Sequence, residues 1–203
     1  MHIEQIALKV AASERLTDAD ALFLFEYPDL IAVGELAALA NERRNGRRVF
    51  FNVNRHINHT NICINRCKFC AFSKTAEEAG AYCYDMDEIR NRAIEAVAQG
   101  ATEIHIVGGL HPDLPFEFYL EMLATIRDAS ADLHIKAFTA VEIEYLTRIS
   151  GLSIAATLEK LKNAGLGSLP GGGAEILGKA VRAQLCPEKI SGEEWLAVMR
   201  EVH

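Results

Sequence analysis

From residue 49 to the end of the chain, stretches with strand character alternate with helical patterns at intervals of roughly 30 residues. Strands are expected at 49–57, 103–107, 133–138 and 167–169, and helices at 85–99, 115–129, 141–149, 153–164, 175–185 and 191–203. Such alternation predicts βαβ units, an α/β fold and a parallel sheet. A closed (βα)₈ barrel takes about 250 residues. We therefore expect only about the first four βα units of a TIM-type barrel, with a compact four-unit fold as the alternative.

The segment before this alternation is predicted to be helical. Thr17 begins a run with the form of a helix N-cap and an acidic first turn. A second helix is expected at 29–45, because arginines lie in its last turn and Gly46 follows it, which suits the free carbonyls and the helix dipole. We expect two parts, an N-terminal helical segment at 1–48 and the βα part at 49–203.

The charge and hydropathy of the chain narrow the classes of partner. The formal net charge is −7, whereas proteins that bind nucleic acid non-specifically usually carry a basic footprint. The apolar stretches are interrupted well before the roughly 20 residues that a membrane helix needs. We therefore expect no nucleic acid, no membrane and a cytoplasmic location. In a reducing cytosol, clustered cysteines are more often metal ligands or catalytic groups than disulfides.

Three cysteines follow the first expected strand in the pattern C-x₃-C-x₂-C, at Cys63, Cys67 and Cys70. The carboxyl edge of a parallel sheet is where α/β proteins place their chemistry. Three thiolates on one loop can bind three irons of a [4Fe–4S] cluster and leave the fourth iron open. The alternatives are a zinc site that recruits His59, or cysteines without a ligand. The two other cysteines, at 83 and 186, are expected to be packing residues.

The second expected strand ends in a glycine pair, Gly108 and Gly109, followed by His111. Two glycines after a strand allow the backbone to approach a ligand closely, although a plain turn explains them equally well. His111 lies on the loop at the functional edge and is a candidate substrate residue. His105, within the strand, could face either side of the sheet.

Polar groups also follow the third and fourth expected strands. Thr139 and Glu142 lie where a barrel presents polar side chains to its ligand, but their spacing also fits a capping box. Three glycines at 171–173 precede Glu175. A glycine run is entropically costly, which favours a backbone that lies against a bulky ligand. Glu175 is either a ligand contact or a carboxylate in the first turn of a helix.

The cysteine loop and the glycine segments together resemble the radical S-adenosylmethionine (SAM) superfamily. The resemblance implies that the three cysteines bind a [4Fe–4S] cluster, that the methionyl group of SAM binds the open iron, and that one electron cleaves SAM to a 5′-deoxyadenosyl radical. It implies that Phe69 lies near the adenine and that backbone of Gly108 and Gly109 contacts the SAM amine. Glu175 would contact the amine or the ribose. Some relatives carry a basic residue for the SAM carboxylate near position 194, where this chain has Glu194 in a capping-box pattern.

Several segments narrow the resemblance to aminofutalosine synthases of menaquinone biosynthesis, notably 52–58, 67–72, 105–115, 136–143 and 168–176. Cyclic dehypoxanthine futalosine synthase and FO synthase share the cysteine loop and the glycine segments. The resemblance implies a small-molecule substrate, 3-[(1-carboxyvinyl)oxy]benzoate. The 5′-deoxyadenosyl radical would add to its enol-ether double bond, and rearrangement with loss of the carboxyl group would then give 6-amino-6-deoxyfutalosine. It also implies an electron donor such as flavodoxin or ferredoxin. A catalytically inactive fragment is a further alternative, and the oligomeric state is left open.

The substrate named by this resemblance is an anionic aromatic molecule, so a basic residue is expected to face it. Arg55, His56 and Lys136 are the candidates. Their order in the sequence does not decide among them.

Overall fold

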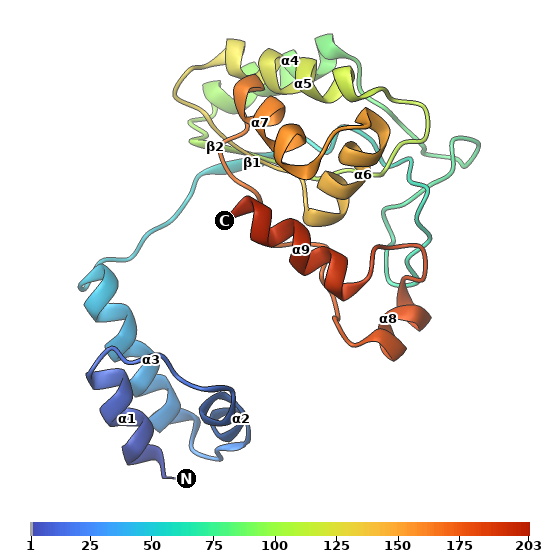
Figure 1. The fold of residues 1–203 in the computed structure, drawn as a ribbon. Coiled ribbons are helices and arrows are strands. Elements are labelled where there is room, and N and C mark those ends of the chain that lie inside the picture. The colour runs from blue at the N-terminus through green and yellow to red at the C-terminus, as the bar shows by residue number, and fades with distance from the viewer. Residues whose placement is uncertain (1) are drawn as a thin grey trace. The chain divides into compact units, whose positions relative to one another are not determined.

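The computed structural model describes residues 2–203, so the first residue of the expected segment 1–48 lies outside the described residues (Figure 1). The chain divides into two compact units, one up to Phe51 and the other comprising Asn52–His203. Within residues 2–203, no helix is both long and apolar enough to cross a membrane.

The first unit consists of helices α1 (Ile3–Ala11), α2 (Asp18–Glu26) and α3 (Leu30–Asn45). The predicted cap at Thr17 is confirmed, because Thr17 Oγ1 accepts a hydrogen bond from Asp20 N and the Asp20 carboxylate accepts one from Thr17 N. Lys9 of α1 forms an ion pair with the same carboxylate at 2.7 Å and so joins α1 to α2. Helix α3 ends at Gly46, whose φ of 62° allows the chain to leave the helix, as predicted.

The second unit is an α/β fold around a parallel sheet in the order β1-β2-β3. The strands are β1 (Asn54–His56), β2 (Glu103–Ile106) and β3 (His134–Ala137). The helices are α4 (Met86–Ala98), α5 (Phe116–Ala129), α6 (Ala140–Ser150), α7 (Ile154–Ala164), α8 (Lys179–Leu185) and α9 (Gly192–Val202). Figure 1 shows α4 and α5 side by side over the sheet.

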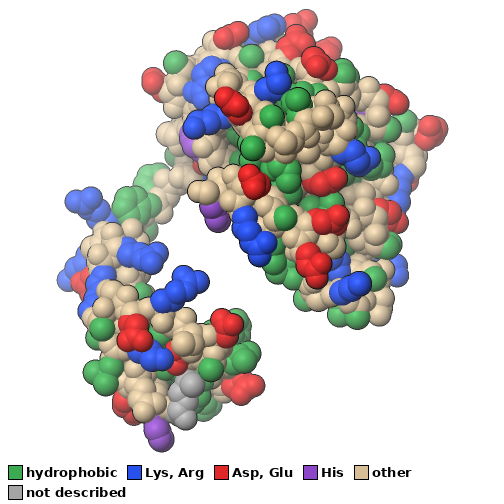
Figure 2. Space-filling view, in the orientation of Figure 1, with side chains coloured by type: hydrophobic (Ala, Val, Ile, Leu, Met, Phe, Trp, Pro, Cys, Tyr) green, Lys and Arg blue, Asp and Glu red, His purple; other side chains and the backbone are tan. Residues whose placement is uncertain are grey.

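The core of this unit lies between the sheet and its helices. Alternate residues of β2 and β3, such as Ile104 and Ile135, are fully buried in it. They pack in one cluster with apolar side chains of α4 and α5, including Ile89 and Met122. The residues between them on the strands are polar and lie on the opposite face of the sheet, because side chains alternate along a strand. On the face of the molecule in Figure 2, acidic and basic side chains are interspersed over this unit.

Two expected strands differ from the structure. The stretch 167–169 forms only a single parallel bridge, between Lys136 and Ser168. Ser168 N donates to Ile135 O and Ser168 O accepts from Ala137 N, so the next bond of the ladder would need an N–H at Pro170, which proline lacks. The first strand is shorter than expected, and Phe50 and its neighbours at 49 and 51 are exposed without a strand partner among the described residues.

The helix expected to begin at Glu175 begins instead at Lys179. Gly173 and Glu175 both have left-handed backbone conformations, with φ of 84° and 53°, and this conformation cannot start a right-handed helix. Glu175 is therefore not a first-turn carboxylate. The capping box predicted for the last helix is confirmed at Ser191 and Glu194.

Candidate functional site

The cysteine loop follows β1 and is tied to distant parts of the second unit by backbone hydrogen bonds. Ile64 N donates to Leu110 O at 3.0 Å, beside the segment after β2. Lys68 N donates to Leu185 O at 2.8 Å, at the end of α8. The loop is thereby held between the carboxyl end of the sheet and α8, although it contains no regular secondary structure.

A cavity of about 250 Å³ lies at this edge of the sheet. Eight of the residues singled out in the sequence line it, namely Cys63, Cys67, Phe69, Cys70, Gly108, Thr139, Glu142 and Glu175. Gly109 and His111 do not line it. The Nδ1 atom of His111 accepts a hydrogen bond from Asp113 N, so this ring stabilises its own loop.

The three thiols differ in their surroundings. Cys63 Sγ accepts a hydrogen bond from Asn65 N at 3.4 Å, an interaction that stabilises negative charge on sulfur. Burial raises the pKa of Cys67 to about 11, and the positive charge of Lys189 opposes this rise. Cys186 is buried, as expected of a packing residue, whereas Cys83 is exposed and that expectation is wrong. Cys83 lies on a surface loop whose backbone pairs with Thr60, which leaves its side chain in solvent.

Glu142 connects the ends of two strands. One carboxylate oxygen accepts from Thr139 N at 2.7 Å and Thr139 Oγ1 accepts from Glu142 N, which is the capping box. The other oxygen accepts from Gly108 N at 2.9 Å. Burial raises the pKa of Glu142, and its two backbone hydrogen bonds oppose that rise. The Gly108 N–H already donates to this carboxylate and is not available to a ligand. Gly108 can therefore contact a ligand through its carbonyl oxygen, as a hydrogen-bond acceptor.

The glycine pair is required by close contacts within the protein. A Cβ atom on Gly108 would lie 2.4 Å from Cε1 of His59, and one on Gly109 would lie 2.1 Å from Ile62 O. His59 is almost fully buried, and no described group forms a hydrogen bond with either ring nitrogen. Burial lowers the pKa of His59 to about 4. The neutral imidazole therefore acts as a rigid filler behind Gly108.

The glycine run at 171–173 contacts the protein unevenly. A Cβ atom on Gly171 would meet no atom within 4 Å, whereas one on Gly173 would lie 2.8 Å from Val141 Cγ2. Gly172 O accepts a hydrogen bond from Trp195 Nε1 at 3.1 Å. Of the three, Gly173 lines the cavity.

Lys189 is a cavity residue that sequence reasoning missed. Its Nζ atom lies 2.7 Å from Glu175 Oε1 and 5.3 Å from the centre of the Phe69 ring. It is the one lysine or arginine among the described residues that line the cavity. No motif marks it, because its position depends on how α8 and the following turn pack beside the cysteine loop.

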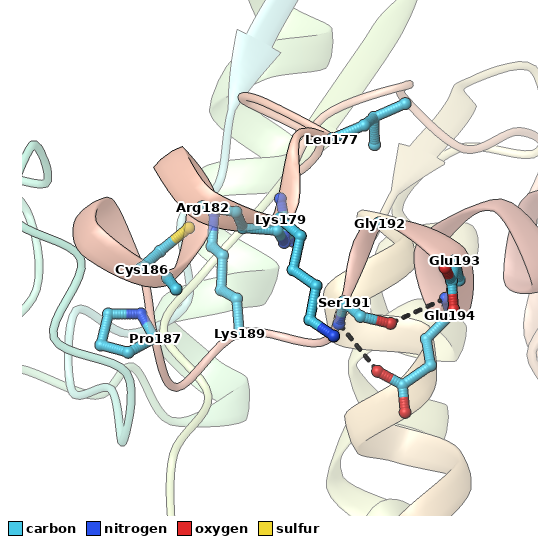
Figure 3. Close-up of a pocket in the computed structure, with 11 residues that line it drawn as sticks. Leu177, Lys179, Arg182, Cys186, Pro187, Lys189, Ser191, Gly192, Glu193 and Glu194 are labelled. Atoms are coloured by element: carbon cyan, nitrogen blue, oxygen red, sulfur yellow. Dashed lines mark hydrogen bonds between the residues drawn. The ribbon is translucent and has the colours of Figure 1, made fainter.

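Glu194, by contrast, does not reach the cavity. Its carboxylate accepts a hydrogen bond from Ser191 N at 2.7 Å, and Ser191 Oγ accepts one from Glu194 N (Figure 3). Figure 3 shows these residues beside a second hollow of about 370 Å³, between α8 and the start of α9. Lys189 lines both hollows.

The donor set around the first cavity fits an iron–sulfur cluster better than a single metal ion. Within residues 2–203, no three His, Cys, Asp or Glu side chains converge closely enough to hold one ion. His59, the fourth ligand of the zinc alternative, packs against Gly108 and the ring of Tyr119. In a cubane each thiolate binds a different iron, so the sulfurs need only surround a common space. Cys63, Cys67 and Cys70 all line the same cavity.

Comparisons with known proteins agree with this chemistry. The family model described as "Radical SAM superfamily" matches residues 57–203. Aminodeoxyfutalosine synthases of Streptomyces coelicolor and Thermus thermophilus are 40% and 38% identical, each over 98% of this chain and over 51% and 53% of their own lengths. A 5-amino-6-(D-ribitylamino)uracil–L-tyrosine 4-hydroxyphenyl transferase of Methanopyrus kandleri is 45% identical over 78% of this chain and 43% of its own. This chain spans about half the length of these relatives.

Solved structures support the same fold. Methylornithine synthase superposes with a TM-score of 0.69 and 20% identity, over 97% of this chain and 55% of that one. The [FeFe]-hydrogenase maturase HydG superposes with a TM-score of 0.72 and 19% identity, over 98% and 43%. At these identities the likeness concerns the fold alone.

Proposed function

This chain belongs to the radical SAM superfamily, and we propose on that premise that it transfers the 5′-deoxyadenosyl group of SAM to 3-[(1-carboxyvinyl)oxy]benzoate, as an aminofutalosine synthase does. The observation that carries the proposal is the cavity in which three thiols meet the ends of β2 and β3. The relatives named aminodeoxyfutalosine synthase match almost the whole chain. A bound [4Fe–4S] cluster supplies the electron that cleaves SAM.

In this proposal Cys63, Cys67 and Cys70 hold the cluster. The loop is already tied down on both sides, at Leu110 and Leu185, so the thiols are positioned with little loss of entropy on binding. The hydrogen bond from Asn65 N to Cys63 Sγ would lower the negative charge on that ligand.

SAM would occupy the remainder of the cavity. Lys189 supplies the positive charge for the methionyl carboxylate. Some relatives place a basic residue for this carboxylate near position 194, where this chain has the acidic Glu194. Glu175, the ion-pair partner of Lys189, would accept hydrogen bonds from the amine or the ribose. The Gly108 carbonyl accepts from the amine, and Phe69, which is half exposed, covers the adenine.

The half barrel expected from the sequence belongs to this proposal. The three parallel strands and the bridge at Ser168 would be the first four positions of a TIM-type barrel. The relatives are about twice as long, and the remaining strands of such a barrel would come from the part of their sequences that this chain does not match. The electron donor would be a small redox protein such as flavodoxin or ferredoxin.

A second candidate reaction follows from the other group of relatives. Proteins named 5-amino-6-(D-ribitylamino)uracil–L-tyrosine 4-hydroxyphenyl transferase are 45% identical over 158 residues and 41% identical over 196 residues of this chain. The two reactions would use the same cluster and SAM site but would differ in the group transferred, a 5′-deoxyadenosyl group in the first and a 4-hydroxyphenyl group from L-tyrosine in the second, and in its acceptor.

An anaerobic assay distinguishes the two candidates. The iron-reconstituted chain is incubated with SAM, dithionite and either 3-[(1-carboxyvinyl)oxy]benzoate or L-tyrosine with 5-amino-6-(D-ribitylamino)uracil, and the products are identified by mass spectrometry. We expect 6-amino-6-deoxyfutalosine from the first mixture. A hydroxyphenyl adduct from the second mixture alone would replace the proposal with the second candidate. A cluster-loaded chain that forms no product and no 5′-deoxyadenosine would be an inactive fragment.

A further inference from the structure

One face of the sheet in the second unit is polar, which is unusual for a parallel sheet. The apolar residues Ile104 and Ile135 point to the helices and are fully buried. The alternate residues of the three strands point to the other face, and all are polar, namely Asn54, His56, Glu103, His105, His134 and Lys136. Parallel sheets are normally apolar on both faces, and the interior of a (βα) barrel is normally filled by branched apolar side chains.

The polar residues contact one another across the strands. His56, His105 and Lys136 form one layer, since they are paired in register. The rings of His56 and His105 stack with their centres 4.7 Å apart. Lys136 Nζ lies 2.8 Å from Glu103 Oε1 in the next layer. These contacts order the layer without removing it from solvent, because His56 is exposed and His105 and Lys136 are half-buried.

This layer leads toward the cysteine cavity. His105 is followed two residues later by Val107, which lines that cavity, and Lys136 lies three residues before Thr139, which also lines it. A group bound over the layer would therefore lie two or three residues along the strands, toward their amino ends, from the place where SAM is proposed to bind. Covering these polar side chains with an apolar core would cost free energy, because they would lose hydrogen bonds to water. The face is therefore suited to a polar ligand.

The chemistry of the layer fits a carboxylate. Lys136 is the one lysine or arginine among the six side chains, and its ammonium has three donors, of which Glu103 takes one. Burial lowers the pKa of His105, with a further contribution from neighbouring His56 and Lys136, so its ring is neutral and donates one N–H. Arg55 of β1 lies on the opposite face of the sheet, where its Nε donates to Gln99.

We infer that His56, His105 and Lys136 bind the benzoate carboxylate of the substrate, while the enol ether reacts in the cysteine cavity. The inference rests on the proposed function for the identity of the substrate. The layer itself rests on the register of the strands, and its preference for a carboxylate rests on the donors of Lys136 and His105.

The test is equilibrium dialysis of the cluster-loaded chain with SAM and without reductant, so that binding is measured without turnover. The probes are 3-[(1-carboxyvinyl)oxy]benzoate, its benzoate methyl ester, and L-tyrosine. Lys136→Met alone would leave the Glu103 carboxylate, whose side chain is 7% exposed, without its partner. The binding variant is therefore Lys136→Met with Glu103→Gln, and Glu103→Gln alone is the matched control. Arg55→Met is the control for loss of a cation on the other face.

We expect the double variant to bind the diacid about tenfold or more weakly, as for loss of one charge-assisted hydrogen bond. Glu103→Gln and Arg55→Met should bind it as tightly as the wild type, and the methyl ester should bind the wild type as weakly as the diacid binds the double variant. Thermal denaturation of each protein shows whether it is folded.

The outcomes separate the inference from the proposed function. Equal Kd values for the diacid in the wild type and the folded double variant would overturn the inference and leave the function in place. Binding of L-tyrosine, but not of the diacid, with the same dependence on Lys136 would overturn the proposed substrate. It would support binding of a carboxylate by the layer of His56, His105 and Lys136. Absence of binding by every carboxylate, or equal binding of the methyl ester, would overturn the inference.

Discussion

Replacement of Gly109 by alanine tests whether the glycine pair serves the placement of the cysteine loop. Gly109 has no left-handed backbone conformation, so an added methyl group meets only a problem of space. Its Cβ atom would lie 2.1 Å from Ile62 O and 2.6 Å from Ile62 C. Ordinary contact begins near 3.4 Å, so one backbone segment has to move by about 1.3 Å. Ile62 immediately precedes Cys63, and the displacement therefore reaches the first of the three proposed cluster ligands.

The magnitude follows from the contacts that this displacement disturbs. Gly109 N donates to Thr60 O at 2.9 Å and Ile64 N donates to Leu110 O at 3.0 Å. Each hydrogen bond contributes about 1 kcal/mol, and overpacking of a tight site costs roughly 1–3 kcal/mol. We expect a loss of about 3–5 kcal/mol, which lowers the Tm of a domain of this size by roughly 10 °C.

The assay is anaerobic reconstitution followed by iron analysis, the visible spectrum near 400 nm and thermal denaturation of the apoprotein. Gly109→Ala should retain little iron and unfold at a lower temperature. Gly171→Ala is the matched control, because a methyl group there meets no atom within 4 Å and the backbone is not left-handed. Wild-type iron content and Tm in Gly109→Ala would refute the reasoning.

Three further predictions concern single side chains. Cys67→Ser should abolish the brown colour and most of the bound iron after reconstitution, whereas Cys83→Ser, on an exposed loop, should retain both. Lys189→Met should weaken SAM binding about tenfold in equilibrium dialysis, while Lys179→Met, which lines only the neighbouring hollow, should not. Hydrogen bonds from its lysine and threonine partners lower the pKa of Asp20 from 3.8 to about 2, so its stabilisation of α1 and α2 is present above pH 4 and is lost as pH falls toward 2. Hydrogen exchange of these helices should therefore differ between wild type and Asp20→Asn at pH 6 and converge near pH 2.

Features governed by local chemistry could be predicted from the sequence. Caps at Thr17 and Ser191 lie where their side chains predicted them, because a cap needs only residues within one turn. The cysteine spacing similarly led to the cavity, because the three thiols share one short loop. The capping box that the sequence offers as the alternative for Thr139 and Glu142 is present. The hydrogen bond between Glu142 and Gly108 joins segments far apart in the chain and had no local signal.

The errors arose where backbone details override periodicity. Pro170 ends the fourth strand after one bridge because it has no N–H to donate. The left-handed conformation at Glu175 delays α8 by four residues, although the pattern of side chains was helical. Lys189 could not be found, because its role depends on the packing of α8 against the cysteine loop rather than on its neighbours in sequence.

The bond between Lys68 N and Leu185 O also has a consequence for protein synthesis. The ribosome makes roughly 5–20 residues per second, so roughly ten seconds separate the appearance of the last cysteine of the loop from that of its anchor on α8. During this interval the loop first lacks both of its attachments and then, once Leu110 has been made, still lacks the one at Leu185. We therefore expect the thiols to remain accessible while the chain is being made, and iron and sulfide to be inserted only after α8 has left the ribosome.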